Sequence, residues 1–305
     1  MKKNIKYIIL TIFIVVLSIF GFTEDDIKDY LDSISNSTDK KIEAVETFDV
    51  STDLKIYFLD VGEADSILIQ NNGENMLIDA GNNEDGPKLV KYFKSLGIEK
   101  IKYVVGTHPH EDHIGGIDNI LKEFKVTKLF MPDVTTNTTT FESVLDIAKD
   151  KGLNVTIPKI NSTYKLGEAK FKFLYSGNNK EDLNSCSIIV KLYFGKKSFL
   201  FMADLPSTIE EKLLDKDIKS DVLKVGHHGS SSSSSKEFLD IVKPKYAIIS
   251  VGKNNDYHHP HTSVLNRLKK VNAKIYRTDK SGTILLTSTG DKIKIKEIKT
   301  DVDGG

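Results

Sequence analysis

The sequence predicts an α/β protein in which two halves, each a β-sheet covered by helices on its outer side, pack sheet against sheet. From Leu54 onward, short runs rich in β-branched and aromatic residues alternate with amphipathic stretches. From about Ser187 the same succession of elements occurs a second time. Hydrophobic residues make up 39% of the 305 residues, which is enough for a packed core. We therefore expect one folded domain over residues 52–298.

The first half is expected to begin with strands and then to alternate helix and strand. Residues 54–61, 66–70 and 75–81 have the β-branched content and the bounding turn residues of strands. Residues 88–97 carry hydrophobic residues at helical spacing, and residues 102–108 read as a further strand. This last strand ends directly at a histidine-rich segment.

The second half begins with two strands joined by a turn at Gly195 and Lys196. Helices are expected from about Ser207, near Lys236 and near Thr262. The strands expected in this half are 187–195, 197–204, 221–226, 246–252, 275–278, 283–288 and 292–298.

The segments outside the folded domain predict export. Three lysines within the first six residues precede an apolar stretch, so residues 1–22 have the order of a signal peptide or membrane anchor. Residues 23–51 carry nine acids and three lysines with few aromatics, which predicts a flexible acidic linker. A disordered tail is expected at 299–305. We therefore expect an extracellular protein, or one anchored in the membrane and facing outside, with cleavage left open.

Composition gives few further hints. Lys+Arg and Asp+Glu both number 43, so the net charge is zero and the chain as a whole has no bias toward polyanions. Cys186 is the only cysteine, which excludes an intramolecular disulfide, and we interpret it as a small buried hydrophobe.

The block from His108 to His113 (HPHEDH) predicts metal binding. His108 and His110 are two residues apart where a strand ends, so an extended backbone points both imidazoles the same way. Asp112 and His113 follow at the turn into a helix that begins with a glycine pair. Imidazole and carboxylate are ligands that Zn²⁺ and Mn²⁺ accept. A polar surface loop is the alternative interpretation.

This block resembles the H-x-H-x-D-H signature of the metallo-β-lactamase superfamily. More narrowly, the chain resembles the hydrolase domain of late-competence DNA-uptake channel proteins and their secreted relatives. The supporting stretches are, in this order, FLDVGEADSILI, MLIDAG, THPHEDHIGG, FMADL, LKVGHHGS and HHPH, and they fall within residues 54–297. The resemblance implies a four-layer αββα sandwich and two divalent metal ions, for which we expect Zn²⁺, with Mn²⁺ as the alternative.

The resemblance also implies roles for individual residues. The implied ligands are His108 and His110 for the first metal, Asp112 and His113 for the second, Asp204 as the bridge, and His227 as the remaining ligand of the second. His228 is the less favoured ligand and is expected near the metals or the substrate, because adjacent side chains on an extended backbone point apart. Asp79 resembles the carboxylate that orients a liganding histidine, with a turn-capping role as its alternative.

Two departures from the family pattern stand out. The histidine that usually completes the first metal site is replaced by Asn184-Ser185-Cys186-Ser187. An oxygen of Asn184 or Ser185 is then the candidate ligand, which would favour an oxygen-preferring metal such as Mn²⁺. Before Asp65 the branch usually has Gln-Gly, whereas this chain has Glu63-Ala64.

Two further segments are candidates for substrate contact. His259 and His261 precede a helix and could contact a phosphate or protonate a leaving group, with a structural loop as the alternative. The serine run that begins at Ser230 could bind an anion through hydroxyls and backbone N–H groups, with a flexible solvent-exposed loop as its alternative.

We therefore expect an exported metal-dependent hydrolase that cleaves a phosphodiester, either DNA or a cell-envelope polymer, by attack of metal-bound hydroxide. Asp112 would act with the metals, and His259 or His261 would assist. A lactam substrate is disfavoured by the missing histidine. The alternative is a catalytically silent, metal-stabilised binding module in DNA uptake or at the cell envelope. The sequence indicates no protein partner, and indicates contact with a membrane only if residues 1–22 are retained.

Overall fold

A computed structural model describes residues 53–298 of the chain. The expected signal segment 1–22, the linker 23–51 and the tail 299–305 lie outside the described residues. Within 53–298, none of the helices combines the length and the apolar character needed to span a bilayer.

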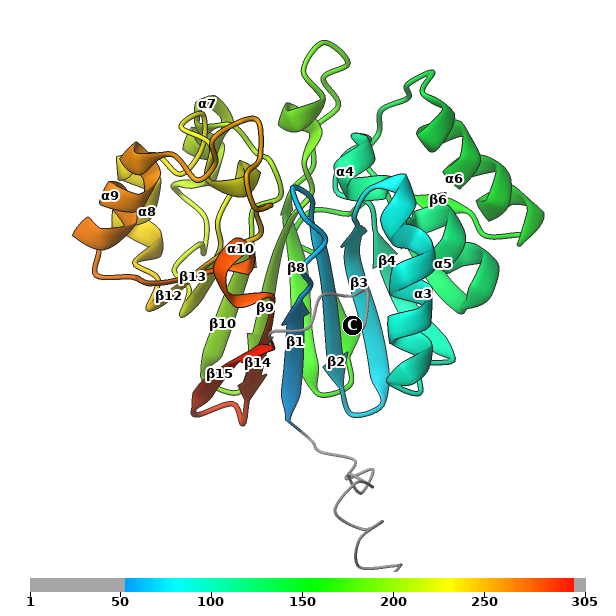
Figure 1. Ribbon diagram of the computed structural model, residues 1–305, viewed down its shortest axis with the longest axis horizontal. Coiled ribbons are helices and arrows are strands. Elements are labelled where there is room, and N and C mark those ends of the chain that lie inside the picture. Colours follow the sequence, from blue (N-terminus) through cyan, green and yellow to red (C-terminus); the bar gives the residue numbers. More distant parts are fainter. Residues whose placement is uncertain (1–52, 299–305) are drawn as a thin grey trace, which may run out of the picture. The chain divides into compact units, whose positions relative to one another are not determined.

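Two mixed β-sheets face each other and helices cover their outer sides, which confirms the predicted four-layer αββα sandwich (Figure 1). The first sheet contains, in spatial order, β15 (Ile293–Ile298), β14 (Thr283–Ser288), β1 (Leu54–Phe58), β2 (Ser66–Asn71), β3 (Glu74–Ala80), β4 (Lys100–Val105), β5 (Lys125–Phe130) and β6 (Val155–Thr156). The second contains β13 (Lys274–Arg277), β12 (Tyr246–Ile249), β11 (Val222–Lys224), β10 (Lys197–Phe201), β9 (Ile189–Phe194), β8 (Ala169–Tyr175) and β7 (Thr163–Leu166).

The longer helices lie on the outer faces of the sheets. On the first sheet these are α3 (Gly86–Ser95), α5 (Ile117–Glu123) and α6 (Thr139–Asp150), and on the second they are α8 (Lys236–Val242) and α9 (Thr262–Lys270) (Figure 1). Short helical turns are α4 (Glu111–Ile114), α7 (Ser207–Glu210), α10 (Thr278–Ser281), η1 (Asn83–Asp85), η2 (Leu183–Cys186), η3 (Glu211–Leu213) and η4 (His227–Gly229). We predicted no helix or strand between residues 125 and 175, where the structure has β5 to β8 and α6.

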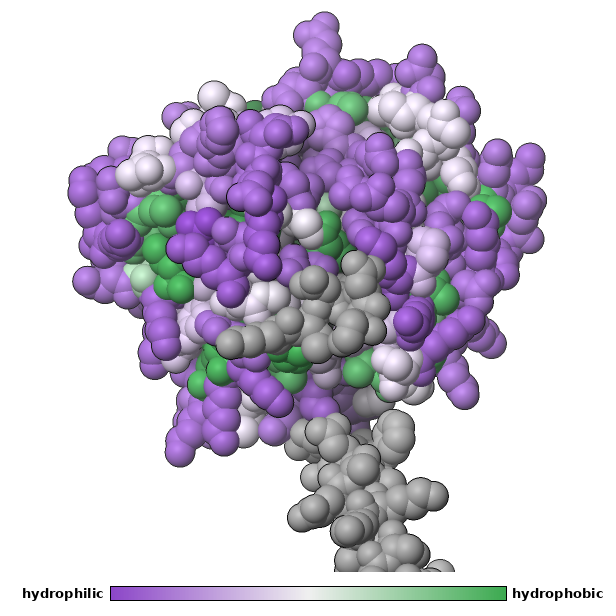
Figure 2. All heavy atoms as spheres, viewed as in Figure 1, coloured by the Kyte–Doolittle hydropathy of each residue, from purple (hydrophilic) through white to green (hydrophobic). Residues whose placement is uncertain are grey.

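Three hydrophobic clusters hold the layers together. The central one fills the space between the sheets and is rich in aromatic rings, such as Tyr103 edge-on to Phe171 at 5.2 Å and Phe130 against Phe173 at 4.8 Å between centroids. The other two join each sheet to its own helices. On the face drawn in Figure 2, hydrophobic residues form only small separate patches among hydrophilic ones. Most apolar residues of the strands are therefore buried in these clusters.

The sheet topology brings the site segments to one edge. Strands β3, β4 and β5 run parallel, and so do β10, β11 and β12. Neighbouring parallel strands end at the same edge of their sheet. The loop after β4 in the first sheet and the loops after β10 and β11 in the second carry the candidate site residues. Strands β14 and β15 cross back from the second half and extend the first sheet, because β14 pairs antiparallel with β1.

Candidate metal centre

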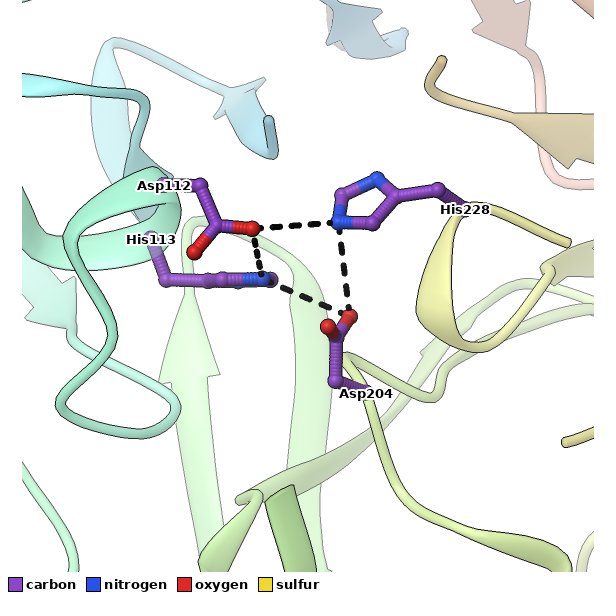
Figure 3. A group of neighbouring side chains, drawn as sticks. All are labelled: Asp112, His113, Asp204 and His228. Carbon is purple, nitrogen blue, oxygen red and sulfur yellow. Dashed lines mark ion pairs between the residues drawn. The ribbon is translucent and has the colours of Figure 1, made fainter. Parts of the chain in front are cut away.

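Two carboxylates and two imidazoles converge at this edge. Asp112, His113, Asp204 and His228 each place one ligand-type atom within 4.8 Å of the other three (Figure 3). His113 Nε2 lies 3.5 Å from Asp112 Oδ2 and 3.3 Å from Asp204 Oδ1. His228 Nε2 lies 3.4 Å from the same oxygen of Asp112 and 3.7 Å from the same oxygen of Asp204. The four form a closed ring of ion pairs, which we call the quartet.

The quartet fits a divalent cation. His113 Nε2, Asp204 Oδ1 and His228 Nε2 are buried and have no hydrogen-bond partner among residues 53–298. An unpartnered buried polar atom costs about 1–3 kcal/mol, so three such atoms facing one point need an explanation. A cation between them would satisfy all three. Nitrogen and oxygen donors of this kind suit Zn²⁺ or Mn²⁺.

Burial and mutual charge set the protonation of the quartet. Burial alone would lower the pKa of His113, but the carboxylates of Asp204, Asp112 and Asp79 raise it well above its ordinary range. Burial likewise opposes the charged form of His228, and the carboxylates outweigh it and raise the pKa to about 9. Burial would raise the pKa of Asp204, but the facing imidazoles hold it well below its usual value. Without a metal, protons on the imidazoles therefore supply the positive charge that the carboxylates require.

Local backbone features bring Asp112 and His113 into place. They lie on α4, directly after the segment that leaves β4. Gly115 directly follows the last residue of this helix. A Cβ added to it would lie 2.2 Å from the carbonyl carbon of Asn82. Only glycine allows the two turns to approach this closely. The glycine pair of the motif thus packs α4 against the turn that follows β3.

Asp79, at the end of β3, orients His113. Its Oδ2 lies 2.8 Å from His113 Nδ1, and its two oxygens also accept hydrogen bonds from the backbone N–H and the hydroxyl of Thr107. With Nδ1 held in this way, Nε2 is the atom that faces the quartet. The structure therefore places Asp79 where the sequence analysis expected an orienting carboxylate.

The quartet contains His228 where we expected His227. The expectation assumed extended backbone, but both residues lie in the tight turn η4 with φ near +50°. In this turn the buried His228 points at the carboxylates and its Nδ1 faces Ser250 O at 3.0 Å. His227 stays beside the quartet, with Nε2 3.5 Å from the other oxygen of Asp204 and Nδ1 3.1 Å from Ser232 Oγ. The structure therefore brings His228, and not His227, into the quartet, while the choice of His227 as a metal ligand stays a prediction.

His108 and His110 form a separate pair next to the quartet. Their Nε2 and Nδ1 atoms face each other at 3.1 Å. Two nitrogens on one tetrahedral zinc would be about 3.3 Å apart, so this spacing suits a shared metal. Burial lowers the pKa of His108 well below its usual value, which favours the neutral form that binds metals. The His108 ring is also close to His113, at 4.1 Å between centroids.

The segment that replaces the usual third histidine places one side chain, Asn184, in the same pocket lining as His110. Asn184 lines the pocket, and its Oδ1 is buried with no hydrogen-bond partner among the described residues. The Ser185 hydroxyl instead donates to the Asp182 carboxylate. Cys186 is fully buried with Sγ 3.0 Å from Asn179 O, which fits the structural role expected for it. Of the two candidate ligands from the sequence, only Asn184 has a side-chain oxygen that makes no hydrogen bond among the described residues.

A pocket of about 600 Å³ opens over the centre. Its lining residues are Glu63, Asn82, Glu84, His110, Glu111, Asp112, Asn184, Asp204, His227, His228, Tyr257 and His259. Among these described residues there is no lysine or arginine. The pocket is large enough to admit a small substrate group. Its rim is acidic, because the lining contains three glutamates and neither lysine nor arginine.

His259 reaches this pocket, and His261 does not. His259 Nδ1 lies 2.8 Å from Glu63 Oε1, while the other oxygen of Glu63 accepts the backbone N–H of Gly252 at 2.7 Å. His261 Nδ1 accepts the backbone N–H of Ser231 at 2.9 Å and is absent from the lining of the pocket. The catalytic expectation for His261 is therefore not supported by its position. Glu63, noted in the sequence only as a departure, is the partner of His259.

The serine run is an ordered turn and not an open cradle. Backbone N–H groups of Ser234 and Ser235 donate to the buried carboxylate of Glu210 at 2.6 and 2.8 Å. Ser230 is buried and its hydroxyl lies 3.0 Å from that of Ser232. Because these groups are used inside the protein, Ser230 is not placed as a phosphate contact.

A buried ion pair behind the quartet was missed in the sequence. Lys224 Nζ lies 2.8 Å from Asp65 Oδ2, and both side chains are almost completely buried. Asp65 also joins the surrounding loops, since its N–H donates to Asp112 O and its carbonyl accepts from Gly81 N–H. Lys224 ends β11, so the pair links the two sheets. The feature of the sequence that could have indicated this ion pair is Lys224, a lysine within an apolar strand.

Comparison with known proteins agrees with this geometry. A family model described as the metallo-beta-lactamase superfamily matches residues 59–253. This chain belongs to that superfamily. Most of its members are metal-dependent hydrolases, and the quartet lies inside the matched range.

Some similar proteins are named for competence or recombination. The chain is 31% identical over 256 residues to ComE operon protein 3 of Bacillus subtilis, covering 77% of this chain and 33% of that protein. It is 29% identical over 250 residues to Recombination protein 2 of Haemophilus influenzae, covering 79% and 30% respectively. The chain thus spans about a third of the length of these relatives. The metallo-beta-lactamase fold protein YhfI of Bacillus subtilis shares the fold, with a TM-score of 0.53, 13% identity, and coverage of 77% of this chain and 100% of YhfI.

Proposed function

We propose that this protein is an exported, metal-dependent phosphodiesterase. The observation that carries the proposal is the quartet, in which three unpartnered buried donor atoms face one point beneath an open pocket. A structural metal site is usually closed by protein ligands, whereas a catalytic site keeps a side open to substrate. The alternative, a catalytically silent binding module, would gain nothing from this opening.

The residues of the quartet would hold the second of two divalent cations, and His108, His110 and Asn184 would hold the first, with Asp204 reaching both. Such cations, when bound, polarise a phosphoryl oxygen and acidify a water molecule. Asp79 keeps His113 in the tautomer that presents Nε2. Asp204 can serve two sites because its Oδ1 faces His113 and His228 and its charge also acts on His108.

His259 is positioned to move a proton. Glu63 accepts from Nδ1, so Nε2 is the ring atom left for the substrate. A histidine held by a carboxylate in this way can protonate the oxygen that leaves when the phosphoester bond breaks. His227 lines the same pocket and is a candidate phosphate contact. No serine or cysteine nucleophile is required by this arrangement.

The names of the relatives favour a nucleic acid as the source of the phosphodiester. A cell-envelope phosphodiester is the second candidate, and it is favoured by a pocket lining without lysine or arginine among the described residues. A long polyanion normally binds through such cationic side chains. Turnover on single-stranded DNA, duplex DNA and a choline-phosphate ester ranks the two, and a steep loss of affinity with salt would show that a polyanion is held by ionic contacts.

The proposal is tested by measuring bound metal and turnover of an aryl phosphodiester together. We expect about two equivalents of a divalent transition metal and activity that is lost on chelation and restored by Zn²⁺ or Mn²⁺. A folded protein that binds no metal would contradict the proposal. A loaded protein that cleaves no phosphodiester would favour the silent binding module.

A further inference from the structure

Tyr257 is the most exposed large hydrophobic residue in the part of the chain that the structure describes. Its exposed fraction is 67%, against 53% for Ile157, 38% for Ile241 and 37% for Val155. Of these four residues, Tyr257 alone lines the pocket of the metal centre. An aromatic ring left in solvent at the mouth of a pocket is a common feature of a binding surface.

The Tyr257 ring continues a stack that begins at the quartet. Its plane is within 16° of the His259 ring, at 5.5 Å between centroids. The His259 ring is in turn within 22° of the His228 ring, at 6.4 Å. Three nearly parallel rings therefore lead from a candidate metal ligand to the mouth of the pocket. The outer face of the last ring is the one available to a ligand.

The His259 ring, on which Tyr257 stacks, is held in place before any ligand arrives. Glu63 fixes the His259 ring through Nδ1. Asn255 braces the loop, because its side-chain amide donates to the carbonyl of His259 while its Oδ1 accepts the His259 N–H, both at 2.9 Å. A preorganised surface of this kind loses little entropy on binding.

The surroundings of Tyr257 select the chemistry of its ligand. Planar rings stack on an aromatic side chain, whereas a quaternary ammonium group is usually enclosed by several aromatic walls. Tyr257 is the only Phe, Tyr or Trp among the described residues of the lining. The carboxylates of Glu63 and Glu111 are already engaged by hydrogen bonds with His259 and Asn83. A flat, uncharged ring fits these conditions better than a cation.

We propose that Tyr257 is the stacking platform for a nucleobase joined to the scissile phosphodiester. This inference rests on the proposed function and specifies its substrate. The described lining contains no lysine or arginine that could hold further phosphates, so a single nucleotide ester is expected to suffice.

Three esters with the same nitrophenolate leaving group test the platform: thymidine 5′-(p-nitrophenyl phosphate), methyl p-nitrophenyl phosphate and p-nitrophenyl phosphorylcholine. For the metal-loaded protein we expect the thymidine ester to have the highest kcat/KM. In Tyr257→Leu the ratio of kcat/KM for the thymidine ester to that for the methyl ester should fall about 5- to 150-fold, mainly through KM. Tyr257→Phe keeps the ring and should keep the ratio.

Ile157→Ala serves as the matched control, since Ile157 is also exposed but lies outside the pocket lining. An unchanged ratio in Tyr257→Leu would overturn the platform, as would a selective loss of the choline ester. The affinity for thymidine 5′-monophosphate relative to methyl phosphate is measured by calorimetry in the same variants. If no ester is cleaved, the proposed function fails, and the calorimetry still decides the platform.

Discussion

The two candidate metal positions differ in how completely the protein provides for them. The quartet has two carboxylates, two imidazoles and a carboxylate that orients one of the imidazoles. The neighbouring pair has two imidazoles and, where the family usually adds a third, only the amide oxygen of Asn184. The quartet also joins both halves of the molecule, whereas the pair comes from one segment. We infer an asymmetric centre in which the second metal binds more tightly than the first.

The largest expected effect comes from removing Asp204, because this carboxylate belongs to the quartet and its charge also acts on His108 of the neighbouring pair. Asp204→Ala should lose both metals and lower kcat by roughly 10³-fold or more, as expected when the groups that hold a catalytic metal are removed. Metal content by mass spectrometry and turnover of a p-nitrophenyl phosphodiester measure the two losses. Retention of two equivalents of metal by the folded variant would exclude Asp204 as the bridge.

The next effect separates His228 from His227. His228→Ala should lose the metal of the quartet and most activity, since it removes a ligand and leaves two carboxylates without their partner. His227→Ala should retain both metals and lower turnover by about 10- to 100-fold, as expected for the loss of a hydrogen bond to a charged phosphate. Metal titration of the two variants side by side is the measurement. The reverse pattern would restore the assignment made from the sequence.

Asn184 tests the weaker position. Asn184→Ala should weaken the first metal by about 10- to 100-fold and leave the second unchanged, because the variant removes an unpartnered side-chain oxygen from the pocket lining that also contains His110. Asn184→Asp keeps an oxygen donor and should restore binding. Competition with a chelator gives both affinities. Equal weakening of the two metals would argue against separate positions.

The smallest expected effect is a pH dependence confined to the quartet. Because the folded-state pKa of His228 is raised to about 9, the metal-free protein should be most stable below pH 6.5 and should lose stability as the pH rises through 9. Metal must displace these protons, so metal affinity should increase with pH over the same range. Calorimetry in buffers of different ionisation enthalpy counts the released protons. No proton release near pH 7 would show that the imidazoles are neutral before metal binds.

The parts of the site that follow one another in the chain were predictable from the sequence. His108 to His113 occupy one segment, so their spacing alone indicates that the side chains converge. The alternation of strands and helices likewise predicted the two-sheet sandwich. The region 125–175 was not assigned. Its β6 and β7 are edge strands of two and four residues, whereas β5, α6 and β8 are regular elements that were not recognised.

What the sequence by itself determined is the fold class, the metal-binding block and the absence of a third histidine, since each depends on local residue type and spacing. The tertiary structure alone decided that His228 and not His227 completes the quartet, because the left-handed turn of η4 sets the direction of both side chains. It also decided the pairing of Glu63 with His259 and of Asp65 with Lys224, whose members lie far apart in the chain. Such contacts depend on how the two sheets pack, and no local pattern records that.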